Sequence, residues 1–289
     1  MISARLAPGK LLSRLPSFAS ILTVALALAT SPSCFGADGW APRVGIQTYT
    51  LRNLNFDQAI AFSAEHGLKD VQLSSQVNPK APREELEKKR DALAAKGLTP
   101  YTFGVNDTSL DKEENRKLFE FAKLMGLKLI IVEPRDFKIW DNLEELAKEY
   151  DMRVAVHNHG IKSLYGNPAV VKNILKHRDA RLGVCLDVGW VTAAGFDAAK
   201  VFREYEGRVF DIHLKDKRIE KVKEGDDVAI DTEIGAGQAN LKGLFAELKA
   251  SNWQGVLAIE TDSPELARNP APFVDGAVRY VKDQASLLK

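Results

Sequence analysis

From Arg43 onward, short apolar runs alternate with helical patterns, and this alternation most constrains the fold. The runs are rich in Val, Ile and Leu, as expected of parallel strands buried on both faces. Strands are predicted at 44–49, 70–73, 99–103, 129–133, 153–157, 182–187, 209–213 and 255–260. Helices are predicted at 56–66, 83–96, 111–125, 143–150, 168–176, 197–205, 241–250 and 272–287. Glycines that follow the first three helices are expected to be left-handed caps. Eight such pairs predict a single α/β domain, a (β/α)8 TIM barrel.

Acidic and imidazole side chains stand where several of these strands end. The carboxyl ends of parallel barrel strands meet on one face, so these side chains are expected to converge there. Carboxylates and imidazoles together are ligands for Mn²⁺, Mg²⁺, Co²⁺ or Zn²⁺. An acidic residue at a strand end can instead cap the next helix, but repetition at several strands favours the metal site. The predicted metal ligands are Glu133, Asp187, His213 and Glu260.

Three further side chains on this face are predicted to move or steer protons. His157 and His159 are two residues apart, so on an extended strand they point the same way. One is expected to reach the metal or its water, and the other to act as a general acid or base or as a hydrogen-bond donor. Lys215 shares the face of His213 and is predicted to polarise a carbonyl or neutralise an alkoxide. Asp216 points away from that face and is expected to form a cap or to pair with a lysine.

The substrate pocket is predicted to include Gln47 and Tyr49, at the end of the first strand, and Trp190, whose ring could stack on a sugar. Purely structural roles for these side chains stay open. The longest break in the pattern, residues 217–237, is charged and is expected to be a solvated loop on the active-site side. Its IGAG sequence resembles a phosphate-binding turn only loosely, and the chain has no P-loop or dinucleotide fingerprint.

The first 37 residues have the pattern of a secretory signal peptide. A basic region is followed by the apolar run FASILTVALALA and then by small residues before a cleavage site near 36–37. The domains predicted are therefore a signal peptide at 1–37 and the barrel at 38–289, in a periplasmic or secreted protein. We expect no stable membrane insertion after cleavage. An uncleaved anchor and a lipoprotein signal ending at Cys34 are the alternatives.

Charge and cysteine content narrow the choice of partners. Three of the 40 basic residues and none of the 39 acidic ones lie in the first 37 positions, which leaves a net charge of −2 after cleavage. Such a balance predicts no nucleic-acid partner. Cys185 then stays as a single thiol inside an apolar run, where a small core residue is expected rather than a nucleophile. The oligomeric state stays open, with a homo-oligomer among the options.

From Arg43 to Lys289, the order and spacing of the motifs resemble those of the sugar phosphate isomerase/epimerase family, the xylose isomerase-like TIM barrels. The motifs are GIQTYTLR, VEP, HNHG, CLDVG, HLKD, GAGQANLKGLFAELK and AIETD. The resemblance implies a divalent metal held by strand-end Glu, Asp, His and Glu. The corresponding positions are Glu133 or a histidine of HNHG, then Asp187, His213 and Glu260.

Two departures from the family pattern concern the site. Many members have Glu where this chain has His157, and many have His where this chain has Trp190, three residues after Asp187. A lost ligand or base would leave metal binding in place and change the chemistry. The small number of histidines also disfavours the endonuclease members, which need several more for three metals.

These observations predict an exported, metal-dependent sugar isomerase or epimerase that abstracts a proton α to a carbonyl. The periplasmic address disfavours phosphorylated sugars as substrates. The alternative is a lyase or dehydratase that uses the same site on a keto-sugar or keto-glycoside, because an enolate next to a leaving group eliminates it. A non-catalytic sugar-binding barrel is the hypothesis from another class, and the Trp190 departure motivates it.

Overall fold

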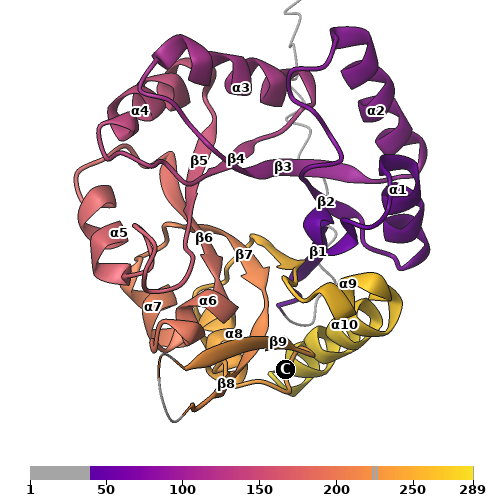
Figure 1. The fold of residues 1–289 in the computed structure, drawn as a ribbon, viewed down its shortest axis with the longest axis vertical. Helices are drawn as coiled ribbons and strands as arrows, with labels where there is room; N and C mark the ends of the chain where they lie inside the picture. Colours follow the sequence, from indigo (N-terminus) through magenta and orange to yellow (C-terminus); the bar gives the residue numbers. More distant parts are fainter. Residues whose placement is uncertain (1–39, 223–224, 226, 289) are drawn as a thin grey trace, which may run out of the picture. The chain divides into compact units, whose positions relative to one another are not determined.

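A closed barrel of eight parallel strands forms the centre of the part of the chain that the structure describes (Figure 1). The computed structural model describes residues 40–222, 225 and 227–288. The barrel strands are β1 (Arg43–Gln47), β2 (Asp70–Leu73), β3 (Thr99–Asn106), β4 (Leu129–Val132), β5 (Arg153–His157), β6 (Leu182–Asp187), β7 (Val209–Leu214) and β10 (Val256–Ile259). Their order is β1-β10-β7-β6-β5-β4-β3-β2, and every pairing is parallel. The predicted (β/α)8 fold is confirmed.

Helices connect the strands and surround them in a ring (Figure 1). They are α1 (Phe56–Glu65), α2 (Arg83–Ala95), α3 (Lys112–Leu124), α4 (Ile139–Tyr150), α5 (Pro168–Leu175), α7 (Ala198–Glu204), α8 (Leu241–Ala250) and α10 (Pro270–Leu287). Gly67, Gly97 and Gly126 follow α1, α2 and α3 with φ angles of 71°, 69° and 74°. The predicted left-handed caps are therefore confirmed at all three helix ends.

The two faces of β4, β5 and β6 pack into two different cores. Leu129, Ile131, Ala155 and Cys185 form a small buried cluster with Phe210 beside it, whereas the alternate residues of the same strands join the larger core. Because side chains alternate along a strand, the small cluster fills the barrel interior. Burial raises the pKa of the Cys185 thiol, in agreement with its predicted role as a core residue. The same inward faces lead, two residues later, to the candidate site.

The prediction of a solvated loop at 217–237 is wrong. The segment contains a two-stranded antiparallel sheet, β8 (Asp216–Glu220) and β9 (Val228–Thr232), which packs against the helix α6 (Val188–Ala193). Its first and last pairs are Asp216 with Thr232 and Glu220 with Val228. The charges masked the strand pattern, because Asp216, Lys217 and Arg218 are consecutive and leave Ile219 as the only apolar residue of β8.

Asp216 holds the base of this hairpin. Its carboxylate accepts hydrogen bonds from the backbone N–H groups of Lys217 (2.9 Å), Gly235 (3.0 Å), Gly237 (2.9 Å) and Ala239 (3.0 Å). The loose resemblance of IGAG to a phosphate-binding turn therefore has a structural basis, because the turn does bind an anion. That anion is the chain's own carboxylate, and the predicted capping role of Asp216 is confirmed.

Three short elements escaped the sequence pattern: the 3-10 helix η1 (Thr48–Leu51), α6, and α9 (Pro264–Arg268). They are too short to show a helical period, and each follows a barrel strand directly or closely. The predicted signal peptide at 1–37 lies outside the described residues. No helix in the described ranges has both the length and the apolar character needed to cross a membrane.

We predict that Asp216→Ala lowers the free energy of unfolding by about 2–3 kcal/mol, because four backbone donors lose a shared acceptor. Urea denaturation of the native protein and the variant measures this. Asp227→Ala is the matched control on the same hairpin, since it removes only an exposed pair with Lys221 and is expected to change stability by less than about 0.5 kcal/mol. Equal losses in both variants would contradict the prediction.

Candidate metal centre and active site

Adjacent strands bring the predicted site residues together at the carboxyl end of the barrel. His157 ends β5, Asp187 ends β6, His213 lies near the end of β7, and Glu260 directly follows β10. The strand register places Asp187 opposite His213. All four side chains are at most 6% exposed. Parallel strands in this register are the reason that residues more than 100 positions apart lie next to one another.

Three of the four side chains, His157, Asp187 and His213, have donor atoms within 4.8 Å of one another, and Glu260 lies beside His213. His157 Nε2 lies 3.1 Å from His213 Nδ1 and 3.5 Å from Asp187 Oδ2. His213 Nδ1 lies 3.8 Å from Asp187 Oδ2 and 3.7 Å from Glu260 Oε2. We call these four residues the central cluster. Its donor set of two imidazoles and two carboxylates suits a divalent cation.

The two carboxylates of the central cluster are buried, and one oxygen of each, Asp187 Oδ2 and Glu260 Oε2, faces the ammonium group of Lys215. The metal fit therefore rests on the chemistry and closeness of the donor atoms rather than on unpartnered oxygens. The residues present fit a metal ion: His157, Asp187 and His213 are the groups that would hold it, with Glu260 beside His213.

Lys215 contributes an ammonium group beside the two carboxylates. Its Nζ lies 3.1 Å from Asp187 Oδ2, 2.5 Å from Glu260 Oε2 and 2.7 Å from Asp262 Oδ2. Burial by itself would lower the pKa of Lys215, but the three carboxylates outweigh it and raise that pKa well above its usual value. The side chain therefore stays charged, which suits a proton donor or an electrostatic partner rather than a base.

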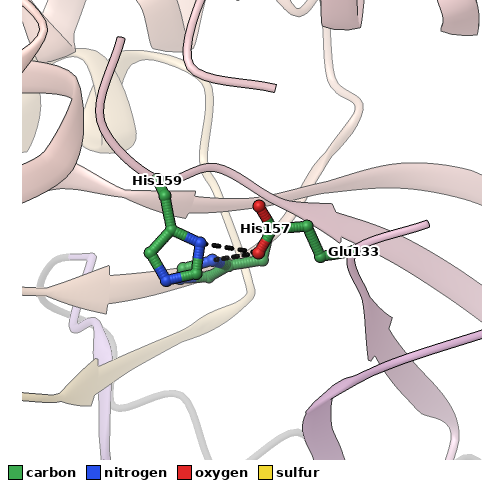
Figure 2. A group of neighbouring side chains, drawn as sticks. All are labelled: Glu133, His157 and His159. Atoms are coloured by element: carbon green, nitrogen blue, oxygen red, sulfur yellow. Dashed lines mark hydrogen bonds and ion pairs between the residues drawn. The ribbon is translucent and has the colours of Figure 1, made fainter. Parts of the chain in front are cut away.

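Glu133 belongs to a second group, with His159 and His157 (Figure 2). His159 Nδ1 lies 2.6 Å from Glu133 Oε2, and His157 Nδ1 lies 3.9 Å from the same oxygen. Burial raises the pKa of Glu133, but the two imidazoles outweigh burial and lower it to about 2. Glu133 is therefore ionised and orients the His159 ring.

Glu133 was predicted as a ligand beside Asp187, and the structure separates the two. Among the described residues, donors within 4.8 Å of one another form three groups: Glu133 with His157 and His159, His157 with Asp187 and His213, and His213 with Asp211 and Cys185 on the barrel-interior side. His157 belongs to the first two, with Nδ1 on the Glu133 side and Nε2 on the central cluster. Of the two alternatives that the family resemblance left open, the geometry favours the strand-five histidine.

A cavity of about 660 Å³ opens beside the cluster. Its wall includes Gln47, Tyr49, His159, Lys215 and Asp262, together with the loop after β2 and the end of β3. Gln47 and Tyr49 thus lie where substrate-binding residues were expected. His159 is partly accessible in this wall, with 42% of its side chain exposed.

Trp190 does not belong to the described lining of this cavity. Its backbone N–H donates to Asp187 Oδ1 (2.8 Å), and its ring lies 4.0 Å from Lys217 Nζ and 5.7 Å from the ring of His159. The tryptophan therefore packs behind the site, where it covers a lysine and supports a histidine. A sugar-stacking role has no support in this placement.

Sequence reasoning missed four residues that complete the site. Lys217 is buried and pairs with Asp231 of β9, and the other oxygen of Asp231 accepts from Thr261 Oγ1 (2.8 Å) and from the Asp262 N–H (2.6 Å). Asp262 follows Glu260 at the spacing that puts side chains on one face, which was an available signal. No pattern pointed to Asp231 or Lys217. Gln72, a polar residue within an apolar strand, was overlooked.

A closed (β/α)8 barrel with carboxylates and imidazoles gathered at its carboxyl end defines a protein whose active site lies at that end. The chain belongs to the family of xylose isomerase-like TIM barrels, whose model matches residues 60–284. The predicted family resemblance is thereby confirmed, and members of this family are enzymes.

Three known proteins illustrate the range of the likeness. The inosose dehydratase of Clostridium perfringens (strain 13 / Type A) is 27% identical over 274 residues, covering 80% of this chain and 91% of the relative. The structure of the IolI protein with a bound zinc atom has a TM-score of 0.67 at 15% identity, covering 86% of this chain and 99% of the other. The 3-keto-D-glucoside 4-epimerase of E. coli has a TM-score of 0.61 at 15% identity, with coverages of 84% and 99%.

We predict that the metal-free protein loses stability as the pH rises from about 5 to 9. Burial raises the pKa of Glu260 to about 7. Burial opposes charge on His157, but Asp187 and Glu133 outweigh it and raise the pKa of His157 to about 9. Both folded-state values exceed the unfolded ones, so each stabilising contribution is complete below the unfolded pKa and is lost as the pH passes the folded pKa.

Thermal unfolding of chelator-treated protein across this range measures the effect, which we expect to be a fall in Tm of about 5 °C or more. The Glu260→Gln variant does not titrate at this position and should show a flatter profile. The pKa of Glu133 is lowered instead, so the pH dependence of its contribution has the opposite sign. Ionised Glu133 stabilises the fold above about pH 4, and this stabilisation is lost only at lower pH. A Tm that rises from pH 6 to 9 would refute the assignment.

Proposed function

We propose that the chain is a metal-dependent lyase that abstracts a proton α to the carbonyl of a small keto-sugar or keto-glycoside and then eliminates a β-oxygen substituent. The observation that carries this proposal is the pair of unlike proton-transfer groups on the cavity wall. An imidazole oriented by a carboxylate lies on one side, and an ammonium group among carboxylates belongs to the central cluster.

The metal that we propose would be held by His157, Asp187, His213 and Glu260. A divalent ion supplies Lewis acidity and stabilises negative charge that develops on a carbonyl oxygen. The closeness of the buried donor atoms of His157, Asp187 and His213 supports this assignment. The donor set admits Zn²⁺, Mn²⁺, Co²⁺ or Mg²⁺, and the zinc atom of the IolI structure makes Zn²⁺ the first ion to test.

His159 is the proposed general base. Glu133 is ionised and can only accept, so the hydrogen-bonded Nδ1 of His159 carries the proton, and Nε2 keeps a free lone pair. Part of the ring is exposed to the cavity, where Nε2 can take a proton from a bound substrate. An imidazole held in one orientation with a free ring nitrogen is suited to this step.

Lys215 is the proposed general acid. Its ammonium proton passes to the departing oxygen as the carbon–oxygen bond breaks, and the electron pair of the broken C–H bond becomes the new carbon–carbon double bond. His159 keeps the abstracted proton until solvent removes it, and solvent reprotonates Lys215. The likeness to an inosose dehydratase at 27% identity supports elimination as the outcome.

Epimerisation or isomerisation is the second candidate. It needs a group that returns the proton to carbon, and the partly exposed Asp262 on the lysine side offers one. The fold shared with a 3-keto-D-glucoside 4-epimerase fits this outcome equally. The predicted signal peptide makes an exported enzyme part of either proposal.

The deciding experiment combines metal analysis with product analysis. We predict about one divalent ion per purified chain and none in the Asp187→Ala, His213→Ala double variant, by elemental analysis. Inosose and a 3-keto-glucoside are then incubated with the loaded enzyme in D₂O and followed by NMR. Olefinic signals indicate elimination, whereas deuterium at the α carbon with a changed configuration indicates epimerisation. Sugar binding without exchange or product would favour a non-catalytic barrel, and absence of metal in both proteins would reject the metal site.

We predict that His159→Gln lowers kcat by about 10²–10⁴-fold, because glutamine keeps a polar side chain but cannot take a proton. The metal content should not change, since His159 lies outside the central cluster. Phe196→Ala is a control at a comparably exposed aromatic side chain outside the cavity wall, and it should retain native kcat. A His159→Gln enzyme with native kcat would remove His159 from the mechanism.

A further inference from the structure

The two ring nitrogens of His213 face two different environments. Nδ1 points at the central cluster, 3.1 Å from His157 Nε2. Nε2 points across the barrel interior to β2, where it lies 2.9 Å from Gln72 Oε1. The carboxylate of Asp211 is farther from this nitrogen, at 3.8 Å. Gln72 is fully buried and is therefore the direct partner of the ring on the side away from the cluster.

The orientation of the Gln72 amide follows from its other contact. Gln72 Nε2 donates to the carbonyl oxygen of Gly104 (3.4 Å), which also accepts from Gln47 Nε2 (2.9 Å). A carbonyl oxygen cannot donate, so the amide nitrogen of Gln72 must face Gly104, and the amide oxygen must face His213. An amide oxygen in turn only accepts. The proton of a neutral His213 ring therefore lies on Nε2.

The position of the Gly104 carbonyl is itself fixed by close packing. A Cβ atom at residue 104 would lie 2.5 Å from the carbonyl oxygen of Ile131, so only glycine lets β3 approach β4 this closely. The chain of contacts thus runs from a backbone carbonyl through the Gln72 amide to one nitrogen of His213. Each member has a defined donor or acceptor role.

We propose that Gln72 is a positioning residue, which holds His213 as the Nε2–H tautomer and so leaves the Nδ1 lone pair free for the metal ion. The proposal rests on the metal site assigned above and extends it to a residue that touches neither metal nor substrate. A hydrogen-bonded partner behind a metal-binding imidazole fixes its tautomer and orientation, and its loss reduces metal affinity by about 10–100-fold in other proteins.

The same arrangement determines which histidine donates and which accepts in the contact between His157 and His213. With Nδ1 of His213 acting as the acceptor, the proton shared over 3.1 Å belongs to His157 Nε2. In the metal-free protein this proton occupies the side of His157 that faces the cluster. Gln72 thereby determines which imidazole gives up a proton when a metal ion enters.

Two measurements test the role of Gln72. In the first, long-range ¹H–¹⁵N spectra of chelator-treated, ¹⁵N-histidine-labelled protein identify the protonated nitrogen of His213, with the resonance assigned through a His213→Asn variant. We expect a protonated Nε2 and an unprotonated Nδ1 in the native protein, and a mixture of tautomers in Gln72→Leu. In the second, calorimetric titration with Zn²⁺ should show an affinity about 10–100-fold lower in Gln72→Leu.

Two further variants separate positioning from packing. Gln72→Glu keeps an acceptor for Nε2–H and should retain the native tautomer, with a Zn²⁺ affinity closer to native than that of Gln72→Leu. Thr102→Val changes a buried residue opposite Gln72 in the β2–β3 register, whose hydroxyl makes no hydrogen bond in the described structure, and should leave tautomer and affinity unchanged. Circular dichroism checks the fold of each variant.

The inference is overturned if native His213 carries its proton on Nδ1, or if Gln72→Leu matches the native protein in both tautomer and affinity. An equal loss of affinity in Gln72→Leu and Thr102→Val would also overturn it, because packing alone would then explain the effect. Should the native protein bind no metal, the proposed function fails, while the nitrogen spectra still decide whether Gln72 fixes the ring.

Discussion

The contact of one buried ammonium group with three carboxylates organises this end of the barrel. Lys215 contacts Asp187 at the end of β6 and Glu260 and Asp262 after β10. A buried carboxylate is stable only when it has such partners. The surrounding network contains four carboxylates, Asp187, Asp231, Glu260 and Asp262, and two ammonium groups, Lys215 and Lys217. Negative charge therefore remains in excess. In the metal-free protein a protonated His157 offsets part of this charge, and a divalent ion that replaces the proton would offset all of it.

The same network attaches the hairpin to the barrel. Asp231 of β9 contacts Lys217 of β8 and the backbone after β10, so the hairpin forms part of the wall behind the site. The two groups that we propose for proton transfer differ from one another because their neighbours differ. His159 faces a single carboxylate and remains partly open to solvent, whereas Lys215 is enclosed by carboxylates. One cavity thus offers a base and an acid without needing two residues of the same kind.

The sequence was sufficient for the barrel because most strands are apolar runs and three of the helices end at a left-handed glycine. It also located the strand-end residues, since alternation and strand order determine which side chains face inward. It could not decide between Glu133 and His157 beside Asp187, because that choice depends on register and side-chain direction rather than on position. The hairpin and Asp231 depended on contacts between distant segments, for which a single sequence carries no pattern. Gln72 was visible as a polar residue in an apolar strand, but its partner lies 141 positions away.

His157 presents one nitrogen to Glu133 and the other to Asp187. A single aromatic ring thereby links the residue that orients the base with a residue that would hold the metal. Changes at positions 133 and 187 therefore act on a shared partner, and their energetic effects are not independent. We therefore expect positions 133 and 187 to change together in evolution. Whether a substitution is tolerated at one of them depends on which residue stands at the other, although the two side chains belong to different donor groups.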